Sequence, residues 1–139
     1  FLYGKLYFNA LLRIADYSAA VEFLERNFKD SSIQLIYSES LLALAKKVDD
    51  AKLLNRLTKL SENAFCGNEQ NPLLLLTLGV LNYQQRNLEQ SRTYLESSLK
   101  IKPSLDATIY LSFVAEATHD NALFADCQKK LLTNIRNFN

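Results

Sequence analysis

The sequence predicts an all-α protein, on three observations: few turn residues, apolar residues at helical spacing, and a pattern that recurs along the chain. Only three glycines and two prolines interrupt 139 residues. Sheet proteins need turn residues at short intervals, and this chain does not supply them. We therefore expect one domain, residues 1–139, built of about four helical hairpins joined by short polar turns.

The clearest hairpin is expected around the apolar stretch PLLLLTLGVLNY, residues 72–83. Asn71 fits a helix N-cap and Pro72 fits the first helical position. The apolar residues that follow occupy two adjacent faces of one helix. A polar break at residues 84–87 precedes a second amphipathic segment, residues 88–101, which is followed by a proline. The apolar stretch is thus predicted to be the first helix of a hairpin and to be buried on two faces.

The same pattern occurs near the amino terminus, in ADYSAAVEFLERNF, residues 15–28. Aligning the two segments places each residue 71 positions from its equivalent. The aligned pairs are Tyr17 with Leu88, Ala20 with Ser91, Leu24 with Leu95, and Phe28 with Leu99. A separation of 71 is about two repeats of a period in the mid-thirties. A two-helix unit with a period of about 34 residues is the signature of the tetratricopeptide repeat.

Residues 72–105 resemble such a repeat in detail. Gly79 stands where two helices cross closely, and Ser91 and Ser98 stand at positions that require small side chains. Leu95 occupies a position for a large residue, which fills the gap between paired helices. The resemblance implies a tetratricopeptide-like superhelix.

The expected units divide the whole chain. Residues 1–33 match mainly in their second helix, and residues 34–71 fit a longer, degenerate unit with a turn at Val48–Asp50. Residues 72–105 form the best unit. Residues 106–139 form a weak last unit, whose register the sequence places only to within one residue.

A finer resemblance covers nearly the whole chain. Residues 71–104, NPLLLLTLGVLNYQQRNLEQSRTYLESSLKIKPS, are similar to the carboxy-terminal repeats of the HemY-type protein encoded with bacterial heme-biosynthesis genes. In that family an LLLTLG helix is followed by a YLE-S-L helix and a proline, and a degenerate repeat containing LIYSESL matches upstream. Membership implies a role linked to late heme synthesis, without an established reaction.

The same resemblance implies a location. Members are held at the cytoplasmic face of the bacterial inner membrane by two amino-terminal spanning helices. This chain begins with Phe, contains no Met and has no apolar run long enough to span a bilayer. We therefore expect a soluble fragment cut from a longer protein, which would reach the membrane only through an anchor that is absent here.

Catalytic, cofactor and metal sites are not expected. His119 is the only histidine and lies in the polar stretch ATHDN, so an exposed turn residue is favoured over a heme ligand or general base. Cys66 and Cys127 match no metal spacing, and packing is favoured over nucleophilic chemistry for both. We therefore predict a protein that is not an enzyme.

The charge balance bears on partners. Sixteen Lys and Arg nearly balance fifteen Asp and Glu, without a basic run, so nucleic acid is not expected to bind. A protein or peptide partner is expected instead, a heme-pathway enzyme being the example that the resemblance implies. The oligomeric state stays open.

The binding surface is expected on the first helices of the repeats, which form the concave wall of such a superhelix. An apolar groove there would accept an amphipathic helix or an extended peptide. The apolar residues of the third unit could instead pack against another repeat or a folded-back carboxy terminus. The predicted groove residues are Lys5, Asn9 and Leu12 in the first unit and Leu76, Val80 and Tyr83 in the third.

Three functional hypotheses follow. The leading one is a non-enzymatic scaffold that docks another protein. The alternatives are a carrier that holds heme or a porphyrin between apolar helices, and a tetratricopeptide adaptor for envelope assembly.

Overall fold

The fold is described here from a computed structural model that covers residues 2–27 and 37–138. Within these ranges every regular element is an α-helix, which confirms the predicted all-α class. The predicted unit boundary at residues 33 and 34, and Phe28 of the aligned segment, lie outside the described residues. The helices are α1 (Leu2–Arg13), α2 (Tyr17–Asn27), α4 (Ser38–Lys47), α5 (Ala51–Phe65), α6 (Pro72–Gln84), α7 (Leu88–Ile101), α8 (Leu105–Ala117) and α9 (Asn121–Phe138).

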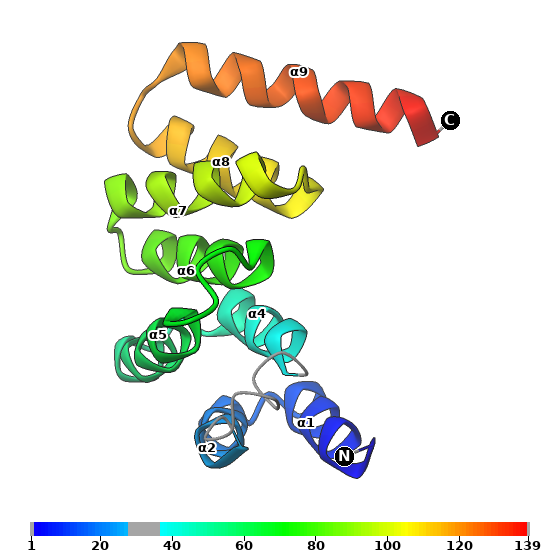
Figure 1. The fold of residues 1–139 in the computed structure, drawn as a ribbon, viewed down its shortest axis with the longest axis vertical. Helices are drawn as coiled ribbons and strands as arrows, with labels where there is room; N and C mark the ends of the chain where they lie inside the picture. The colour runs from blue at the N-terminus through cyan, green and yellow to red at the C-terminus, as the bar shows by residue number, and fades with distance from the viewer. Residues whose placement is uncertain (1, 28–36, 139) are drawn as a thin grey trace.

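The described helices follow one another as pairs along the long axis of the molecule, with the two chain ends at opposite extremes (Figure 1). α1 packs on α2, and α2 packs on both α4 and α5. α6 then packs on α4 and α5, and α8 packs on α6 and α7. Each pair is therefore held by the pair before it. The second pair contains the turn predicted at Val48–Asp50, which joins α4 to α5.

Three of the turns within pairs share one geometry, and this fixes the register of the chain. Each contains a non-glycine residue with a positive φ, at Ala15 (58°), Arg86 (66°) and His119 (58°). In each, the next residue donates its backbone N–H to a carbonyl five positions back, over 2.8–3.0 Å. Ala15 and Arg86 are 71 positions apart, as the sequence alignment predicted. Arg86 and His119 are 33 apart, which settles the register of the last pair.

Helix α6 begins as the sequence predicted. The side chain of Asn71 accepts hydrogen bonds from the backbone N–H of Leu73 at 2.9 Å and of Leu74 at 3.3 Å. Pro72 follows at the first helical position, where its missing N–H leaves no donor unpaired.

The burial of α6 goes beyond the prediction. We expected two buried faces, whereas nine consecutive residues, 74–82, are buried. The reason is that α4, α5, α7 and α8 all pack on this one helix. A helix that is apolar on every side is stable in water only when neighbours surround it, and α6 is the centre of the core.

The α6–α7 crossing explains why its small positions hold glycine and serine. A Cβ atom placed on Gly79 would lie 2.6 Å from Cδ2 of Leu95, so any side chain there would collide with α7. The buried Ser91 hydroxyl donates to the Gly79 carbonyl at 2.6 Å, and the buried Ser98 hydroxyl donates to the Pro72 carbonyl at 2.8 Å. Serine therefore keeps the volume small and adds a hydrogen bond between the two helices.

Candidate functional site

Two apolar residues of the predicted groove, Leu76 and Val80, do not line a surface. Leu76 is 4% exposed and Val80 is 0% exposed. Both belong to the core, because four helices surround α6. The groove prediction is therefore wrong for these two residues, which are buried in the core among the helices that pack on α6.

The predicted residues of the first unit are accessible but lie apart from α6. Lys5 and Asn9 are exposed on α1, and Leu12 is half-buried against the core. α1 packs mainly on α2, whereas α6 packs on α4, α5, α7 and α8. The structure therefore does not join the two halves of the predicted groove into one surface.

Tyr83, the last predicted groove residue, takes part in an aromatic cluster that joins α6 to α8. Its ring centroid lies 5.9 Å from that of Tyr110 and 5.9 Å from that of Phe113, and the latter two are 5.4 Å apart. Tyr83 and Tyr110 are half-buried, and Phe113 is 39% exposed. We call these three residues the aromatic surface. Tyr110 and Phe113 are three positions apart on α8, and they were missed because the register of the last unit was open.

Polar contacts from α4 border the aromatic surface. Lys46 Nζ lies 2.8 Å from Oδ2 of Asp106, one turn before Tyr110 on α8. The Gln84 side chain donates to the Lys46 carbonyl at 3.4 Å. Burial raises the pKa of the Tyr110 phenol, and the nearby Asp106 charge raises it further. The tyrosine is therefore a neutral hydrogen-bond donor and acceptor at physiological pH.

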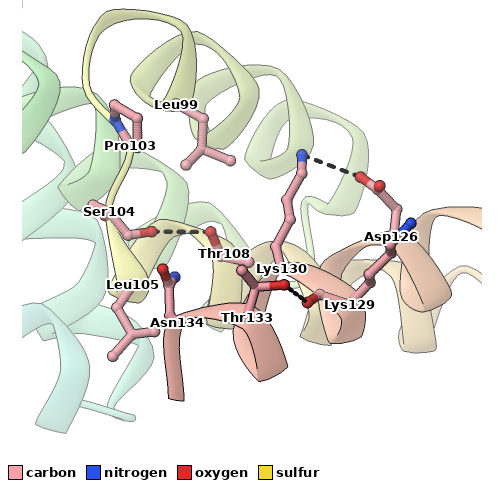
Figure 2. Close-up of a pocket in the computed structure, with 10 residues that line it drawn as sticks. All are labelled: Leu99, Pro103, Ser104, Leu105, Thr108, Asp126, Lys129, Lys130, Thr133 and Asn134. Atoms are coloured by element: carbon pink, nitrogen blue, oxygen red, sulfur yellow. Dashed lines mark hydrogen bonds and ion pairs between the residues drawn. The ribbon is translucent and has the colours of Figure 1, made fainter. Parts of the chain in front are cut away.

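A groove of about 760 Å³ lies elsewhere, between the end of α7, the start of α8 and α9 (Figure 2). Leu99, Pro103 and Leu105 give it an apolar part, and Lys129 and Asn134 stand on the α9 side. Lys130, also in its lining, pairs with Asp126 at 3.1 Å. The groove is open to solvent, and its lining offers packing and hydrogen bonding without a histidine or a cysteine.

His119 is an exposed turn residue, as the sequence indicated. It follows the carboxyl end of α8, whereas the groove is at the amino end of that helix. Thirteen residues of helix separate the two ends, which is about 20 Å. His119 is not among the residues that line the groove.

The two cysteines differ in their surroundings. Cys127 is buried, and burial raises the pKa of its thiol, so it is a packing residue as predicted. Cys66 is exposed at the end of α5, so the packing prediction is wrong for it. The reason is that Cys66 leaves the helix just before Gly67, whose φ of 89° turns the chain into solvent. Among the described residues, no group of His, Cys, Asp and Glu could hold a metal ion.

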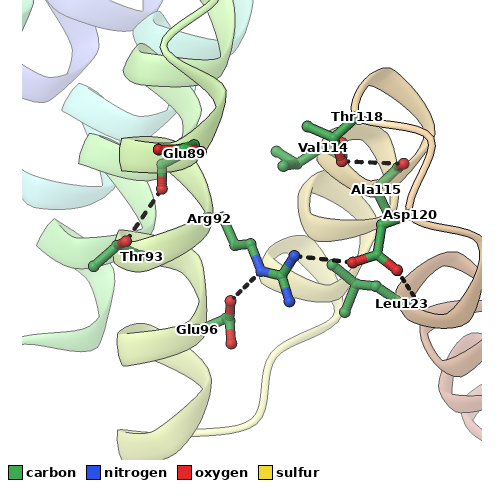
Figure 3. Close-up of polar contacts among 9 residues, drawn as sticks. All are labelled: Glu89, Arg92, Thr93, Glu96, Val114, Ala115, Thr118, Asp120 and Leu123. Atoms are coloured by element: carbon green, nitrogen blue, oxygen red, sulfur yellow. Dashed lines mark hydrogen bonds and ion pairs between the residues drawn. The ribbon is translucent and has the colours of Figure 1, made fainter.

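Arg92 fixes the last pair onto the third (Figure 3). Its Nε donates to Glu96 at 2.6 Å, and its Nη1 donates to Asp120 at 3.0 Å, in the turn between α8 and α9. Asp120 also accepts from the Leu123 backbone N–H at 3.1 Å. That bond, followed by the Arg92 bond, lowers the pKa of Asp120, and the two carboxylates raise the pKa of Arg92. This cluster is fully engaged in holding helices together.

Comparison with known proteins does not assign the chain to a family. No family model and no curated protein matches the chain. No helix in the described ranges has both the length and the apolar character needed to cross a bilayer.

Proposed function

We propose that this chain is a non-enzymatic, helical-repeat scaffold that docks a protein or peptide partner on the aromatic surface of α6 and α8. The observation that carries the proposal is the partial exposure of Phe113 within a three-ring cluster built by two different helix pairs. Aromatic side chains contribute large contact areas at little entropic cost and are enriched at protein interfaces.

The border of the aromatic surface supports a specific contact. The Lys46–Asp106 pair presents one charge of each sign beside the rings, and both side chains are partly exposed. Mixed charges around an aromatic centre favour a partner with an apolar anchor and polar flanks. A tetratricopeptide-like superhelix would place such a surface on its concave wall.

The physiological part of the proposal rests on the resemblance of residues 71–104 to HemY-type repeats. It assigns the scaffold to late heme biosynthesis at the cytoplasmic face of the bacterial inner membrane, with a heme-pathway enzyme as the partner. The carrier alternative gains no support from His119, which is not among the residues that line the groove in Figure 2.

Site-specific photocrosslinking tests the docking surface. A benzophenone side chain replaces Phe113 in one protein and Leu132, an exposed apolar residue of α9, in the control. Both proteins are irradiated with purified late heme-pathway enzymes and with a membrane extract. We expect a discrete adduct from position 113 that Tyr110→Ala weakens, and none from position 132. The same adducts from both positions would refute docking on the aromatic surface.

Hemin titration separates the scaffold from the carrier. The scaffold predicts no saturable change in the heme absorption spectrum. A saturable change that is lost in His119→Ala would replace the scaffold with the carrier.

A further inference from the structure

The groove between α7, α8 and α9 has a smaller counterpart one helix pair earlier. Four of its residues have equivalents, 33 positions back along the chain, that line a crevice between the second and third pairs. The equivalent residues are Thr108 and Leu75, Lys130 and Ser97, Thr133 and Lys100, and Asn134 and Ile101. The two hollows therefore occupy the same place in the repeating structure. The crevice holds about 290 Å³ and the groove about 760 Å³.

Two differences in the surrounding chain explain the larger volume of the groove. Phe65, in the lining of the earlier crevice, packs edge-on against Tyr94 of α7 at a centroid distance of 6.1 Å. The position equivalent to Tyr94 in α9 holds Cys127, a small side chain. The connection from α5 to α6 has six residues, whereas three residues connect α7 to α8. The groove is wider because a small residue replaces an aromatic ring and a shorter connection borders it.

The hydroxyl groups of the groove are already engaged with the protein itself (Figure 2). The Thr108 hydroxyl donates to the Ser104 carbonyl at 2.9 Å, and the Thr133 hydroxyl donates to the Lys129 carbonyl at 2.9 Å. Oγ of Ser104 accepts from the Ala107 backbone N–H at 3.0 Å. Most of the remaining surface is apolar. An extended peptide would need partners here for its backbone N–H and C=O groups, whereas a hydrocarbon chain needs none.

The volume of the groove is too small to enclose a helix. An α-helix with its side chains is about 10–12 Å across, so two turns occupy roughly 1,000 Å³. The groove holds about 760 Å³, which lies within the range of about 300–1,000 Å³ typical of small-molecule sites. Together with the engaged hydroxyl groups, this volume favours a small molecule that has a long apolar part.

Charge indicates the other part of that molecule. Asp126, Lys129 and Lys130 gather at one side of the groove, away from Leu105 (Figure 2). Asp126 and Lys130 neutralise each other at 3.1 Å. Lys129 is exposed and forms no ion pair within the described residues. The lining therefore carries one uncompensated positive charge, which matches a molecule with an apolar body and a single negative head.

We propose that this groove binds a fatty carboxylate, whose unbranched hydrocarbon chain lies against Leu99, Pro103 and Leu105 and whose carboxylate pairs with Lys129. The site is separate from the aromatic surface of α6 and α8, so either proposal stands without the other. An ion pair that is exposed to solvent changes affinity by about fivefold at most. Burial of the hydrocarbon chain therefore supplies most of the affinity, and the charge supplies the preference for an anion.

Three small molecules separate the two contributions. Decanoate carries the chain and the carboxylate, decyltrimethylammonium carries the same chain with the opposite charge, and acetate carries the carboxylate without the chain. Each is titrated into the intact chain below the concentration at which it forms micelles. The methyl resonances of Leu99, Leu105 and Ile14 are followed by NMR. Ile14 is an exposed apolar residue of α1 and reports non-specific adsorption.

We expect saturable shifts at Leu99 and Leu105 with decanoate. Decyltrimethylammonium should bind several-fold more weakly at low salt, and the difference should shrink at high salt, because the lysine is exposed. Acetate should give no saturable shift, and Ile14 should not respond to any of the three molecules.

Two pairs of variants locate the site. Lys129→Gln should remove the preference for decanoate and keep the affinity for the chain, whereas Lys52→Gln, at an exposed lysine of α5, should change neither. Leu105→Gln should weaken binding of both amphiphiles, whereas Leu6→Gln, at an exposed leucine of α1, should not. Because all four positions are exposed, unchanged thermal melting will verify that each variant remains folded.

Four outcomes would overturn the proposal. The first is the absence of saturable shifts at Leu99 and Leu105 with millimolar decanoate. The second is equal affinity for the two amphiphiles, or a preference that Lys129→Gln leaves unchanged. The third is an equal response of Ile14, which would show non-specific adsorption. The fourth is a shift of Leu99 and Leu105 that depends on protein concentration without any amphiphile, which would place a second copy of the chain in the groove.

Discussion

Helices α1 and α6 occupy equivalent places in their pairs, yet their surroundings are opposite. Residues 74–82 of α6 are all buried, whereas in α1 only Phe8 and Leu11 are buried among the side chains described. The pairs share the 71-residue offset and the same turn geometry. What differs is the number of neighbouring helices, because α6 lies between two pairs and α1 belongs to the first pair that the structure describes. The comparison teaches that the neighbours of a helix, and not its apolar content, set how much each residue contributes to the stability of the fold.

The largest expected effect tests this difference at one pair of equivalent positions. Leu78→Ala in α6 should cost about 3–4 kcal/mol of unfolding free energy, because it leaves a cavity in a fully buried site. Tyr7→Ala in α1 should cost about 1 kcal/mol or less, because that residue is 53% exposed. Urea denaturation measures both, and similar losses would remove the distinction between end and centre.

The next effect concerns the crossing within each pair. Gly79→Leu should destabilise the chain by about 3 kcal/mol, because any side chain collides with Leu95. The equivalent residue of α1 is Phe8, which is buried, so the α1–α2 crossing accepts a large side chain. Phe8→Leu, a smaller change of volume, should cost below about 1.5 kcal/mol. Unchanged melting in Gly79→Leu would mean that the helix register is wrong.

Tyr83 and its equivalent Leu12 extend the comparison to half-buried positions. Tyr83→Ala should lower the free energy of unfolding by about 2 kcal/mol. This value lies between about 0.5 kcal/mol for an exposed site and about 3–5 kcal/mol for a buried aromatic residue. The loss reflects ring contacts with Tyr110 and Phe113. Leu12→Ala should cost about 1 kcal/mol, since α1 packs mainly on one described helix, α2, and the side chain loses fewer contacts. A cost near zero for Tyr83→Ala in denaturant titration would show that the aromatic cluster adds nothing to folding.

A reciprocal exchange tests the hydrogen bond between α7 and α6. Ser91→Ala should cost about 1 kcal/mol, because the Gly79 carbonyl loses its hydroxyl donor in a buried site. The equivalent residue of α2 is Ala20, which is also buried. Ala20→Ser should not stabilise the first pair, because Phe8 widens the crossing. A gain in stability from Ser91→Ala would mean that packing alone decides this position.

The smallest effect is a dependence on pH. Asp120 has a folded-state pKa below its unfolded value, so it contributes stability above about pH 4 that is lost as the pH falls through the folded pKa. Asp120→Asn should be less stable than the parent near pH 7 and equal to it at the lowest pH. Asp16→Asn is the matched control, since Asp16 caps α2 through Ala19 and pairs with no arginine among the residues that the structure describes. Parallel pH profiles for Asp120→Asn and its parent would exclude this linkage.

Local features of the fold were predictable because they depend on neighbours in sequence. The scarcity of Gly and Pro predicted helices, Asn71–Pro72 predicted the start of α6, and the 71-residue offset matched the turns at Ala15 and Arg86. The exposed turn at His119 followed from its polar neighbours in the same way.

The candidate sites could not be predicted in this way, because they depend on contacts between helix pairs. The apolar spacing of Leu76 and Val80 fits a groove and a core equally well, and only the helices packed around α6 decided for the core. The Tyr83–Tyr110–Phe113 cluster depended on the register of the last pair. A shift of one residue in that register would have placed Tyr110 and Phe113 on another face of α8. The sequence by itself determined the helices, their pairing and the small residues at the α6–α7 crossing, because these follow from hydrophobic period and side-chain volume. Only the tertiary structure decided which apolar faces are covered, because burial depends on the neighbour that each face meets.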